Sequence, residues 1–507
     1  LKLLINVSPN FEVLLENEIK SILKSNKLQV PSIKRYNNSE EELLKLSKYI
    51  WAISNCSRLS ESIRIRVGDS FISKNFNQLK KGMEEIGTEE YIKFFTSSNK
   101  PPQVSVSCSS SKLYHSEAVK ERFLNFFKET ITKEIQSESN SNKLKPIKKI
   151  LKNLHYKKRK QQQENNNNEE PYNIDEEIEK FQNKLDQLVK EENEKEQTKV
   201  YIRVEDDKTQ ISVDAAIPSN GELLYKRSND KHVGEAPIRE TIASAVLMKT
   251  EFNGNTTSLW DPFCGSGTLI QESLSLLKYK PSMSTKLVRK FHFEDFMWHL
   301  KEEYDQYLKL INRDLSKLNE GVFFIGSDIS QRAIDASFHN LKNEGYQNVN
   351  SNQQDTENRL KLFKGDFEQI FKSTIEPLIN NSNNNKQITI ITNLPYGQRI
   401  LNSQTIELID ENQDPQLEQE IFNTLNQKNY SYLNDHITDD LKLLFKRFGM
   451  FLNQHINEPN SIIKDVYVIN GNLYFKNLTT NNNQYNFKWE ELLKFKNGGL
   501  NVELLKL

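Results

Sequence analysis

Residues 258–272 have the sequence SLWDPFCGSGTLIQE, and this stretch decides the fold of the second half of the chain. Its apolar start predicts a short strand, its middle a tight loop, and the residues from Thr268 onward a helix. Gly265 and Gly267 allow the main chain to turn and to approach a ligand without a side chain in the way. The free N–H groups of the following helix favour an electron-rich or anionic group. Because ligands bind at the carboxyl ends of strands in an open parallel sheet, we expect a ligand site here.

Three further stretches predict strands that end in polar residues. Residues 322–328, VFFIGSD, predict a buried strand ending at Asp328, whose carboxylate can accept hydrogen bonds from ribose hydroxyls. Residues 362–367, LFKGDF, place another acid at the end of a strand. Residues 388–397, ITIITNLPYG, predict an apolar strand that ends at Asn393. The order of these stretches along the chain carries more weight than any one of them alone.

These stretches, in this order, resemble the S-adenosylmethionine-dependent methyltransferases that act on exocyclic amines. The specific resemblance is to the RNA guanine-N2 methyltransferases with an N-terminal THUMP domain, whose motifs are similar to DPFCGSGT and TNLPYGQR of this chain. It implies an α/β fold with a Rossmann-like class I domain, whose seven-stranded, mostly parallel sheet ends in an antiparallel hairpin. It also implies S-adenosyl-L-methionine as the cofactor, without a metal. The implied cofactor-binding residues are Pro237, Asp261, Phe263, Gly265, Gly267, Thr268, Asp328, Ile329, Asp366, Phe367 and Asn393.

The resemblance also implies a catalytic loop formed by Asn393, Leu394, Pro395 and Tyr396. A guanine exocyclic amine is a poor nucleophile because its lone pair is delocalised into the ring. The Asn393 side-chain oxygen and the Leu394 carbonyl are expected to accept its two hydrogens and so aim the lone pair. Pro395 is expected to keep the turn rigid, and Tyr396 offers a ring for base stacking. The family more often has Pro at the position of Leu394, but the backbone carbonyl survives that change.

The spacing between the glycine loop and Asp328 departs from that of a dinucleotide-binding fingerprint. Such a fingerprint places its acid ~20 residues after the glycines, whereas this chain inserts residues 279–320, with the aromatic sequence FHFEDFMW and a charged helix. The gap therefore argues against NAD binding. Upstream of the loop, Pro237 is expected in the first turn of a helix with Glu240 near its positive end.

The N-terminal half predicts an α+β region of ferredoxin-like and THUMP character. Residues 105–127, a strand followed by SKLYHS and a basic helix, resemble the THUMP pattern, which implies binding of structured RNA. We expect a ferredoxin-like part at 1–70, a THUMP domain at 71–218 and the methyltransferase domain at 219–507. Helices are predicted at 11–23 and 41–51, strands at 63–67 and 103–108, and a hairpin at 199–204 and 209–215.

A low-complexity insertion, residues 137–198, interrupts the second of these domains. Its basic segment, 143–160, contains Lys and Arg but no acid and could bind RNA phosphates, and a Gln/Asn tract follows it. Because such composition buries little apolar surface, the middle of the insertion is predicted to be a disordered tether. Apolar residues from Ile174 to Leu188 recur at helical spacing and predict one helix.

Composition sets limits on the partners and on the compartment. Lys plus Arg and Asp plus Glu number 69 each, so any RNA-binding surface must arise from local segregation of charge. The 3 cysteines make no metal-binding pattern, and no apolar run approaches membrane-spanning length. We expect an intracellular protein without an obligate protein partner, in the cytoplasm or alternatively in the nucleus, nucleolus or an organelle. Since the chain begins with Leu, the presence of an upstream targeting segment stays an open question.

Three functions remain in consideration. The first is methylation of guanosine N2 in rRNA or tRNA. The second is methylation of another amine, in DNA adenine or protein glutamine, by the same kind of loop. The third is a non-catalytic RNA-binding assembly factor, which we disfavour because Asp328, Asn393 and Tyr396 are intact.

Overall fold

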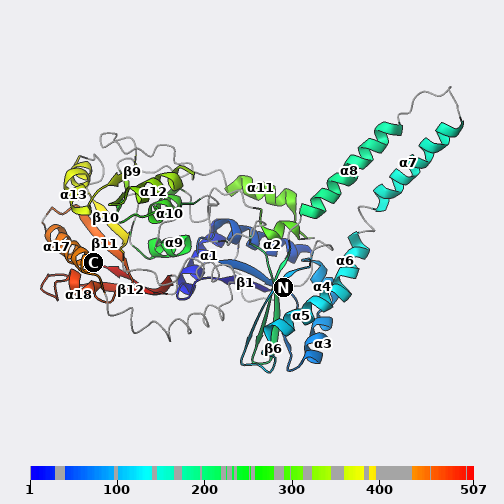
Figure 1. The fold of residues 1–507 in the computed structure, drawn as a ribbon, viewed down its shortest axis with the longest axis horizontal. Coiled ribbons are helices and arrows are strands. Elements are labelled where there is room, and N and C mark those ends of the chain that lie inside the picture. Colours follow the sequence, from blue (N-terminus) through cyan, green and yellow to red (C-terminus); the bar gives the residue numbers. More distant parts are fainter. Residues whose placement is uncertain are drawn as a thin grey trace.

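Two β-sheets, one in each half of the chain, organise the fold (Figure 1). The computed structural model describes residues 2–28, 40–95, 101–139, 145–164, 174–194, 197–217, 224, 231–232, 237–250, 252, 257–278, 290–296, 298–311, 322–343, 359–381, 387–395, 437–456, 458, 460–497 and 500–507. The first sheet and its helices are called the N-terminal module here, and the second sheet and its helices the catalytic module.

The sheet of the N-terminal module has the strand order β1-β2-β6-β5-β4, with β3 paired to β6. Its strands are β1 Lys2–Asn6, β2 Ser62–Arg66, β3 Phe71–Ile72, β4 Gln103–Ser109, β5 Lys199–Glu205 and β6 Lys208–Asp214. The predicted hairpin is confirmed, because β5 and β6 pair antiparallel around Asp206 and Asp207, whose φ angles are 50° and 61°. Since β2 pairs with β6, strands from both sides of residue 70 form one sheet. The assignment of residues 71–218 to a THUMP domain stays a prediction.

Helices cover one face of this sheet and bury an apolar core against it. They are α1 Glu12–Ser25, α2 Glu40–Cys56, α3 Phe76–Ile86, α4 Thr88–Ile92, α5 Ser116–Phe126, the π-helical turn η1 Phe127–Ile131, and α6 Thr132–Ser139. The core contains alternate residues of the strands, such as Ile63 and Ile65 of β2, together with Val67 directly after β2 and Phe123 of α5. The period-two alternation of β2 therefore leaves Arg64 and Arg66 on the other face of the sheet.

The low-complexity insertion forms a helical hairpin, α7 Lys145–Glu164 and α8 Ile174–Glu194, that projects away from both sheets (Figure 1). The predicted disordered tether is therefore wrong for residues 145–164. Ile147, Leu151 and Leu154 recur at helical spacing and are buried, which gives α7 an apolar face against α8. The single helix predicted from Ile174 is confirmed as α8. The rest of the Gln/Asn tract, residues 165–168, lies outside the described residues.

The sheet of the catalytic module has the order β12-β13-β11-β10-β7-β8-β9. Its strands are β7 Ser258–Asp261, β8 Phe324–Asp328, β9 Leu360–Lys364, β10 Ile388–Asn393, β11 Ile463–Asn470, β12 Glu490–Asn497 and β13 Leu500–Lys506. Strands β9, β8, β7, β10 and β11 are parallel neighbours, whereas β12 and β13 form an antiparallel hairpin at one edge. This confirms the predicted seven-stranded, mostly parallel sheet with an antiparallel end hairpin.

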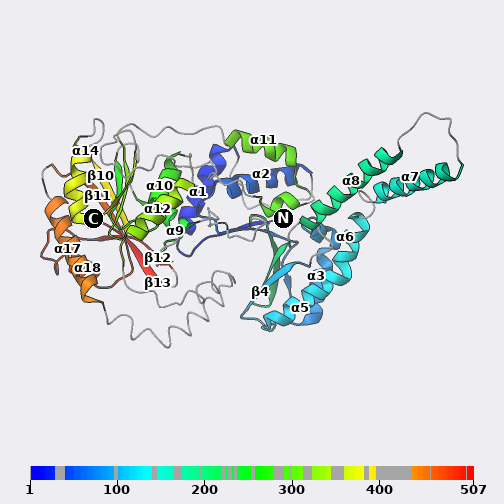
Figure 2. The same ribbon diagram turned by 45° about the horizontal axis from the view of Figure 1, so that its top comes forward.

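Helices cover both faces of this second sheet (Figure 2). One face carries α9 Glu240–Lys249, α10 Thr268–Lys278 and α12 Gln331–Asn343. The other carries α13 Phe367–Ile370, η4 Phe371–Ile375, α14 Glu376–Asn380, α17 Asp439–Ile456 and α18 Phe475–Thr479. Helix α9 begins at Glu240, so Pro237 precedes the helix and its predicted place in the first turn is wrong. No helix in the described part of the chain is both long and apolar enough to cross a membrane.

The two modules exchange core residues. Phe11, Leu15 and Leu59 of the N-terminal half lie in the core between α9, α10 and the second sheet. In the other direction, the insertion after α10 supplies the short helix η3 His292–Asp295 and helix α11 Lys301–Ile311, which pack on the N-terminal module. Tyr304 of α11 lies with its ring centroid 5.4 Å from that of Trp51 in α2. Each module therefore completes the core of the other.

Candidate active site at the carboxyl edge of the second sheet

The strand order places four polar residues along one edge of the sheet. Asp261, Asp328 and Asn393 end β7, β8 and β10, and Asp366 follows β9. These strands are neighbours in the order β10-β7-β8-β9 and run parallel, so their carboxyl ends lie side by side. The chain reverses its direction of winding between β7 and β10, which is the point where open α/β sheets bind ligands.

The glycine loop after β7 is held against β8 and α12. Gly265 donates its N–H to Asp328 Oδ2 at 3.1 Å, and its carbonyl accepts from Ser337 Oγ at 2.7 Å. Gly265 and Gly267 have φ angles of 53° and 80°, which other residues rarely adopt. A Cβ on Gly267 would lie 3.0 Å from Ser337 Oγ, whereas a Cβ on Gly265 would meet nothing within 4 Å. Gly267 is therefore needed for packing, while Gly265 borders open space.

Asp328 keeps acceptor capacity toward that space. Its Oδ1 accepts the N–H of Ser330 at 2.9 Å, and its Oδ2 accepts that of Gly265. A carboxylate has about four lone-pair sites, so two remain for a ligand. The neighbouring Ile329 is 72% exposed, and its apolar side chain is available to a ring placed beside Asp328.

Asp261 links the ends of β7 and β10. Its carboxyl group is 1% exposed and accepts from Thr392 Oγ1 at 2.6 Å and from the Phe263 N–H at 3.2 Å. Burial raises the pKa of Asp261 to about 7. Both described bonds are made within the protein, so Asp261 fixes the start of the glycine loop relative to the strand that carries Asn393.

Asp366 pairs with an arginine that the sequence analysis did not select. Its carboxylate caps α13 by accepting the Glu368 N–H at 3.1 Å, and Arg447 Nη2 of α17 lies 2.8 Å and 2.9 Å from its two oxygens. Arg447 also lies 5.3 Å from the ring centroid of Phe367, which is buried and packs on Phe263 with ring centroids 5.5 Å apart. An acid that caps a helix and a basic residue in a distant helix give no local sequence pattern, so this pair could not be predicted.

Asn393 carries the clearest unfilled hydrogen-bonding capacity of this edge. Its Oδ1 is buried and has no hydrogen-bond partner among the described residues. Buried acceptors of this kind are rare in folded proteins and call for a reason. The next side chain, Leu394, is 1% exposed and lies in the core beside α17, which anchors the backbone after Asn393. Pro395 is exposed, and the predicted Tyr396 lies outside the described residues.

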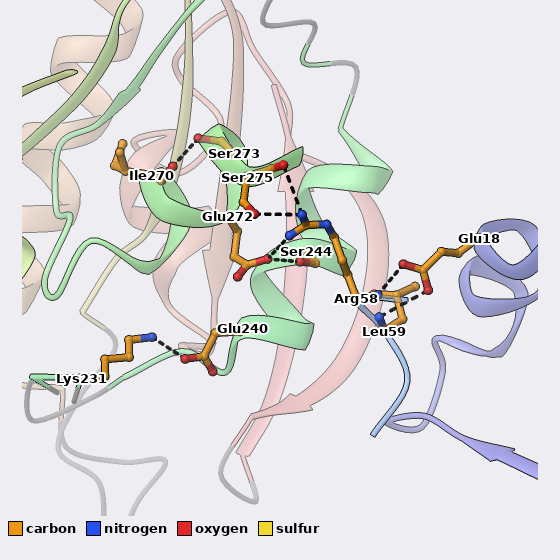
Figure 3. Close-up of polar contacts among 10 residues, drawn as sticks. All are labelled: Glu18, Arg58, Leu59, Lys231, Glu240, Ser244, Ile270, Glu272, Ser273 and Ser275. Atoms are coloured by element: carbon orange, nitrogen blue, oxygen red, sulfur yellow. Dashed lines mark hydrogen bonds and ion pairs between the residues drawn. The ribbon is translucent and has the colours of Figure 1, made fainter. Parts of the chain in front are cut away.

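Helix α10 is held by polar contacts on both sides (Figure 3). At its first residue, Thr268 Oγ1 accepts from Lys231 Nζ at 3.0 Å, and Lys231 also pairs with Glu240 of α9 at 2.6 Å. Asn340 of α12 donates to the carbonyl of Ser266 in the loop at 2.9 Å. The sequence analysis named Thr268 and Glu240 but not Lys231 or Asn340, because these two act through partners that are remote in sequence.

The other side of α10 meets the N-terminal module in a buried ion pair. Arg58 Nη1 lies 3.3 Å from Glu272 Oε2, and both side chains are 2% exposed. Arg58 Nη2 donates to the carbonyl and hydroxyl of Ser275 at 3.1 Å and 2.8 Å, and Ser244 Oγ donates to Glu272. Figure 3 shows Glu18 accepting the main-chain N–H groups of Arg58 and Leu59 on the far side. The helix that starts at the glycine loop is thus fixed to the first module.

Cysteine and metal chemistry find no support in the described part of the chain. Cys264 is 6% exposed, and burial raises its pKa well above the usual range, so its thiol is a packing group. Among the described residues, no group of three or more His, Cys, Asp or Glu side chains could hold a metal ion.

The edge lies within a region that matches a methyltransferase domain. Residues 227–423 match the family model of an RMKL-like methyltransferase domain. A Dictyostelium discoideum protein described as uncharacterized is 43% identical, over 100% of this chain and 99% of its own length. The ribosomal RNA large subunit methyltransferase K/L of Shewanella sp. strain MR-4 is 29% identical over 36% of this chain, and the match spans 23% of that protein.

The fold is also found among solved structures. A crystallised protein assigned as a methyltransferase and complexed with SAH has a TM-score of 0.55 to this chain at 17% identity. The similarity covers 100% of this chain and 97% of that protein. The predicted class I, Rossmann-like methyltransferase fold is confirmed.

Proposed function

From the premise that the chain belongs to one family with the Dictyostelium discoideum protein and carries an RMKL-like methyltransferase domain, we propose a function. The protein methylates the exocyclic N2 amine of a guanosine in structured RNA. Its methyl donor is S-adenosylmethionine, the cofactor of this methyltransferase family. The choice of RNA is supported by the K/L relatives, which are named as ribosomal RNA methyltransferases.

The residues at the sheet edge fit a nucleoside cofactor. The open space beside Gly265 leaves room next to the main chain, and Asp328 retains acceptors for ribose hydroxyls. Asp366 uses three of about four lone-pair sites on Glu368 and Arg447, which leaves one for an exocyclic amine of the adenine ring. Ile329 offers an exposed apolar side chain on the same edge.

The observation that carries the proposal is the unpartnered Asn393 Oδ1 at the end of β10. When bound, S-adenosylmethionine supplies an activated methyl group, so the protein must mainly position and orient a weak nucleophile. An amide oxygen that accepts a hydrogen of the amine draws lone-pair density onto nitrogen and aims it. Because Leu394 is buried, the carbonyl that follows Asn393 is held firmly and can accept the second hydrogen.

The test is single-turnover methylation of ribosomal and transfer RNA by the wild type and by Asn393→Ala. We expect the variant to lose roughly a hundred- to a thousandfold in rate, about 3–4 kcal/mol, while its affinity for S-adenosylmethionine stays near wild type. Asn17→Ala, on the exposed face of α1, is the matched control and should be unchanged. Mass spectrometry of the digested product should show N2-methylguanosine.

Two outcomes would reject parts of the proposal separately. Wild-type rates in Asn393→Ala would remove this residue from the chemistry. Methylation of adenine in DNA or of a protein glutamine, with no product on guanosine, would keep the Asn393 mechanism and reject the substrate.

A further inference from the structure

Helix α7 of the hairpin gathers basic side chains on its exposed face. Ile147, Leu151 and Leu154 of α7 are buried against α8. Helical geometry places the basic and aromatic side chains Lys148, Lys149, Lys152, Tyr156 and Arg159 on the opposite side of α7, and all five are exposed. We call these five residues the basic stripe. It contains no acid and extends over ~17 Å at 1.5 Å per residue.

An ion pair neutralises Lys158, the basic residue of α7 that faces α8. Lys158 pairs with Asp175 at the start of α8. In contrast, Lys148, Lys149 and Lys152 make no ion pair with any residue that the structure describes. The exposed side of α8 is mixed in charge: Asp175, Glu176, Glu179 and Asp186 are accompanied by Lys180, Lys184 and Lys190. Among the described residues of the hairpin, the surface that attracts a polyanion is therefore the exposed face of α7.

Exposed aromatic area within the stripe adds a second feature. Tyr156 is 70% exposed in the middle of the basic residues. Side chains that combine positive charge with an aromatic ring suit a ribose-phosphate backbone and unpaired bases, because lysines contact phosphates and rings stack on bases. A basic patch used only for solubility would not require an exposed tyrosine between its charges.

We propose that the α7–α8 hairpin is an RNA-binding arm, whose basic stripe contacts the phosphate backbone of the substrate RNA outside the active site; this rests on the proposed function. Figure 1 shows the N-terminal module between the arm and the catalytic module. An RNA that reaches both the stripe and Asn393 must therefore pass over the N-terminal module. The arm favours large structured RNA over a short stem that contains only the target guanosine.

The test neutralises the stripe in Lys149→Gln, Lys152→Gln and Arg159→Gln together. The matched control is Lys180→Gln, Lys184→Gln and Lys190→Gln, which makes the same charge change on exposed positions of α8. The probes are a long transcribed ribosomal RNA fragment and a short stem taken from it, bound to the full-length protein at several salt concentrations. Circular dichroism should show unchanged helix content in both variants, since the substituted side chains are exposed.

Each phosphate contact contributes ~0.9 to the slope of log affinity against log salt for a duplex. Loss of three contacts should therefore make the fall in affinity between ~50 and ~200 mM salt about 40-fold smaller than in the wild type. We expect this change for the long RNA only, with the short stem and S-adenosylmethionine bound as before, and no change in the control.

Equal salt slopes in the wild type and the stripe variant would overturn the arm proposal, even if the short stem is still methylated and the proposed function stands. The same conclusion follows if the α8 control changes as much as the stripe variant. Capture of an acidic protein by the stripe, with RNA affinity unchanged, would reassign the surface. Failure of the wild type to bind any RNA would overturn both proposals.

Discussion

Breaking the buried Arg58–Glu272 ion pair should destabilise the protein far more than breaking an exposed pair. We consider Arg58→Met, which removes the guanidinium group and keeps much of the side-chain volume. In the wild type the guanidinium contacts Glu272 and donates twice to Ser275, and both charged side chains are 2% exposed. In the variant, Glu272 retains the bond from Ser244 but stays buried without its cation.

The magnitude follows from the cost of a buried charge that has lost its partner. Removing one member of a buried pair costs about 3–5 kcal/mol, whereas an exposed pair contributes about 0–1 kcal/mol. The double variant Arg58→Met with Glu272→Met removes both charges, so it should be less destabilised than Arg58→Met alone. Lys80→Met is the control, because Lys80 and Glu84 are separated by 3.8 Å with 66% and 54% exposed side chains.

Urea unfolding followed by circular dichroism would measure these free energies. We expect Arg58→Met to lower the free energy of unfolding by about 3–5 kcal/mol and Lys80→Met by less than about 1 kcal/mol. A loss below ~1 kcal/mol for Arg58→Met would refute the reasoning, as would additive losses in the double variant. Either result would mean that apolar exchange between the modules, and not the ion pair, fixes α10.

Three further predictions concern the glycine loop and the acids beside it. Gly265→Ala should weaken S-adenosylmethionine binding at a stability cost of about 1 kcal/mol, because its Cβ enters open space. Gly267→Ala should mainly lower stability, because its Cβ would lie 3.0 Å from a serine hydroxyl. Calorimetric titration measures the first effect and urea unfolding the second. Asp328→Ala should reduce cofactor affinity by roughly 10- to 150-fold, which is the equivalent of ~1.5–3 kcal/mol for hydrogen bonds to a charged group. Unchanged affinity in calorimetric titration would remove Asp328 from the site. The folded-state pKa of Asp261 is raised from 3.8 to about 7, so the wild type should lose stability as pH rises through that window. Relative to the wild type, Asp261→Asn should therefore gain stability between about pH 4 and pH 7, by up to ~4 kcal/mol, as measured by urea unfolding across pH.

The catalytic module could be predicted because its signals are local. An apolar strand followed by an acid, an amide or a glycine turn is visible in a few residues, and the order of such stretches carries the family resemblance that implies the parallel sheet. Asp261, Asp328, Asp366 and Asn393 therefore fall on one edge, as the strand order requires. The closing antiparallel hairpin of β12 and β13 was implied by the family resemblance and not by an apolar stretch, since β12 has the mostly polar sequence EELLKFKN.

The contacts that hold this edge in place were not predictable, because their partners are far apart in sequence. Arg447 and Asp366 belong to different helical segments, and Arg58 lies in a short connection before β2 with nothing local to mark it. The prediction of a disordered tether for the residues of α7 was wrong for another reason. Its spacing of Ile147, Leu151 and Leu154 is a helix signal, but the surrounding lysines lowered the mean hydropathy and favoured a tether.

The long insertion between the glycine loop and Asp328 has a structural explanation. In sequence it only separates two halves of a cofactor site, but in the fold it places Phe291, Phe293 and Phe296 in the core of the N-terminal module. Phe296 packs edge-on against Phe94, with ring centroids 5.3 Å apart. The same insertion follows α10 in the chain. The helix that starts at the cofactor loop is therefore tied to the N-terminal module at two places: by Arg58 along its length and by the aromatic segment after it. Under the proposed function, an RNA that contacts both modules would meet Asn393 in an orientation set by this connection, and selection of the target guanosine would depend on the geometry between the modules as well as on base recognition in the loop.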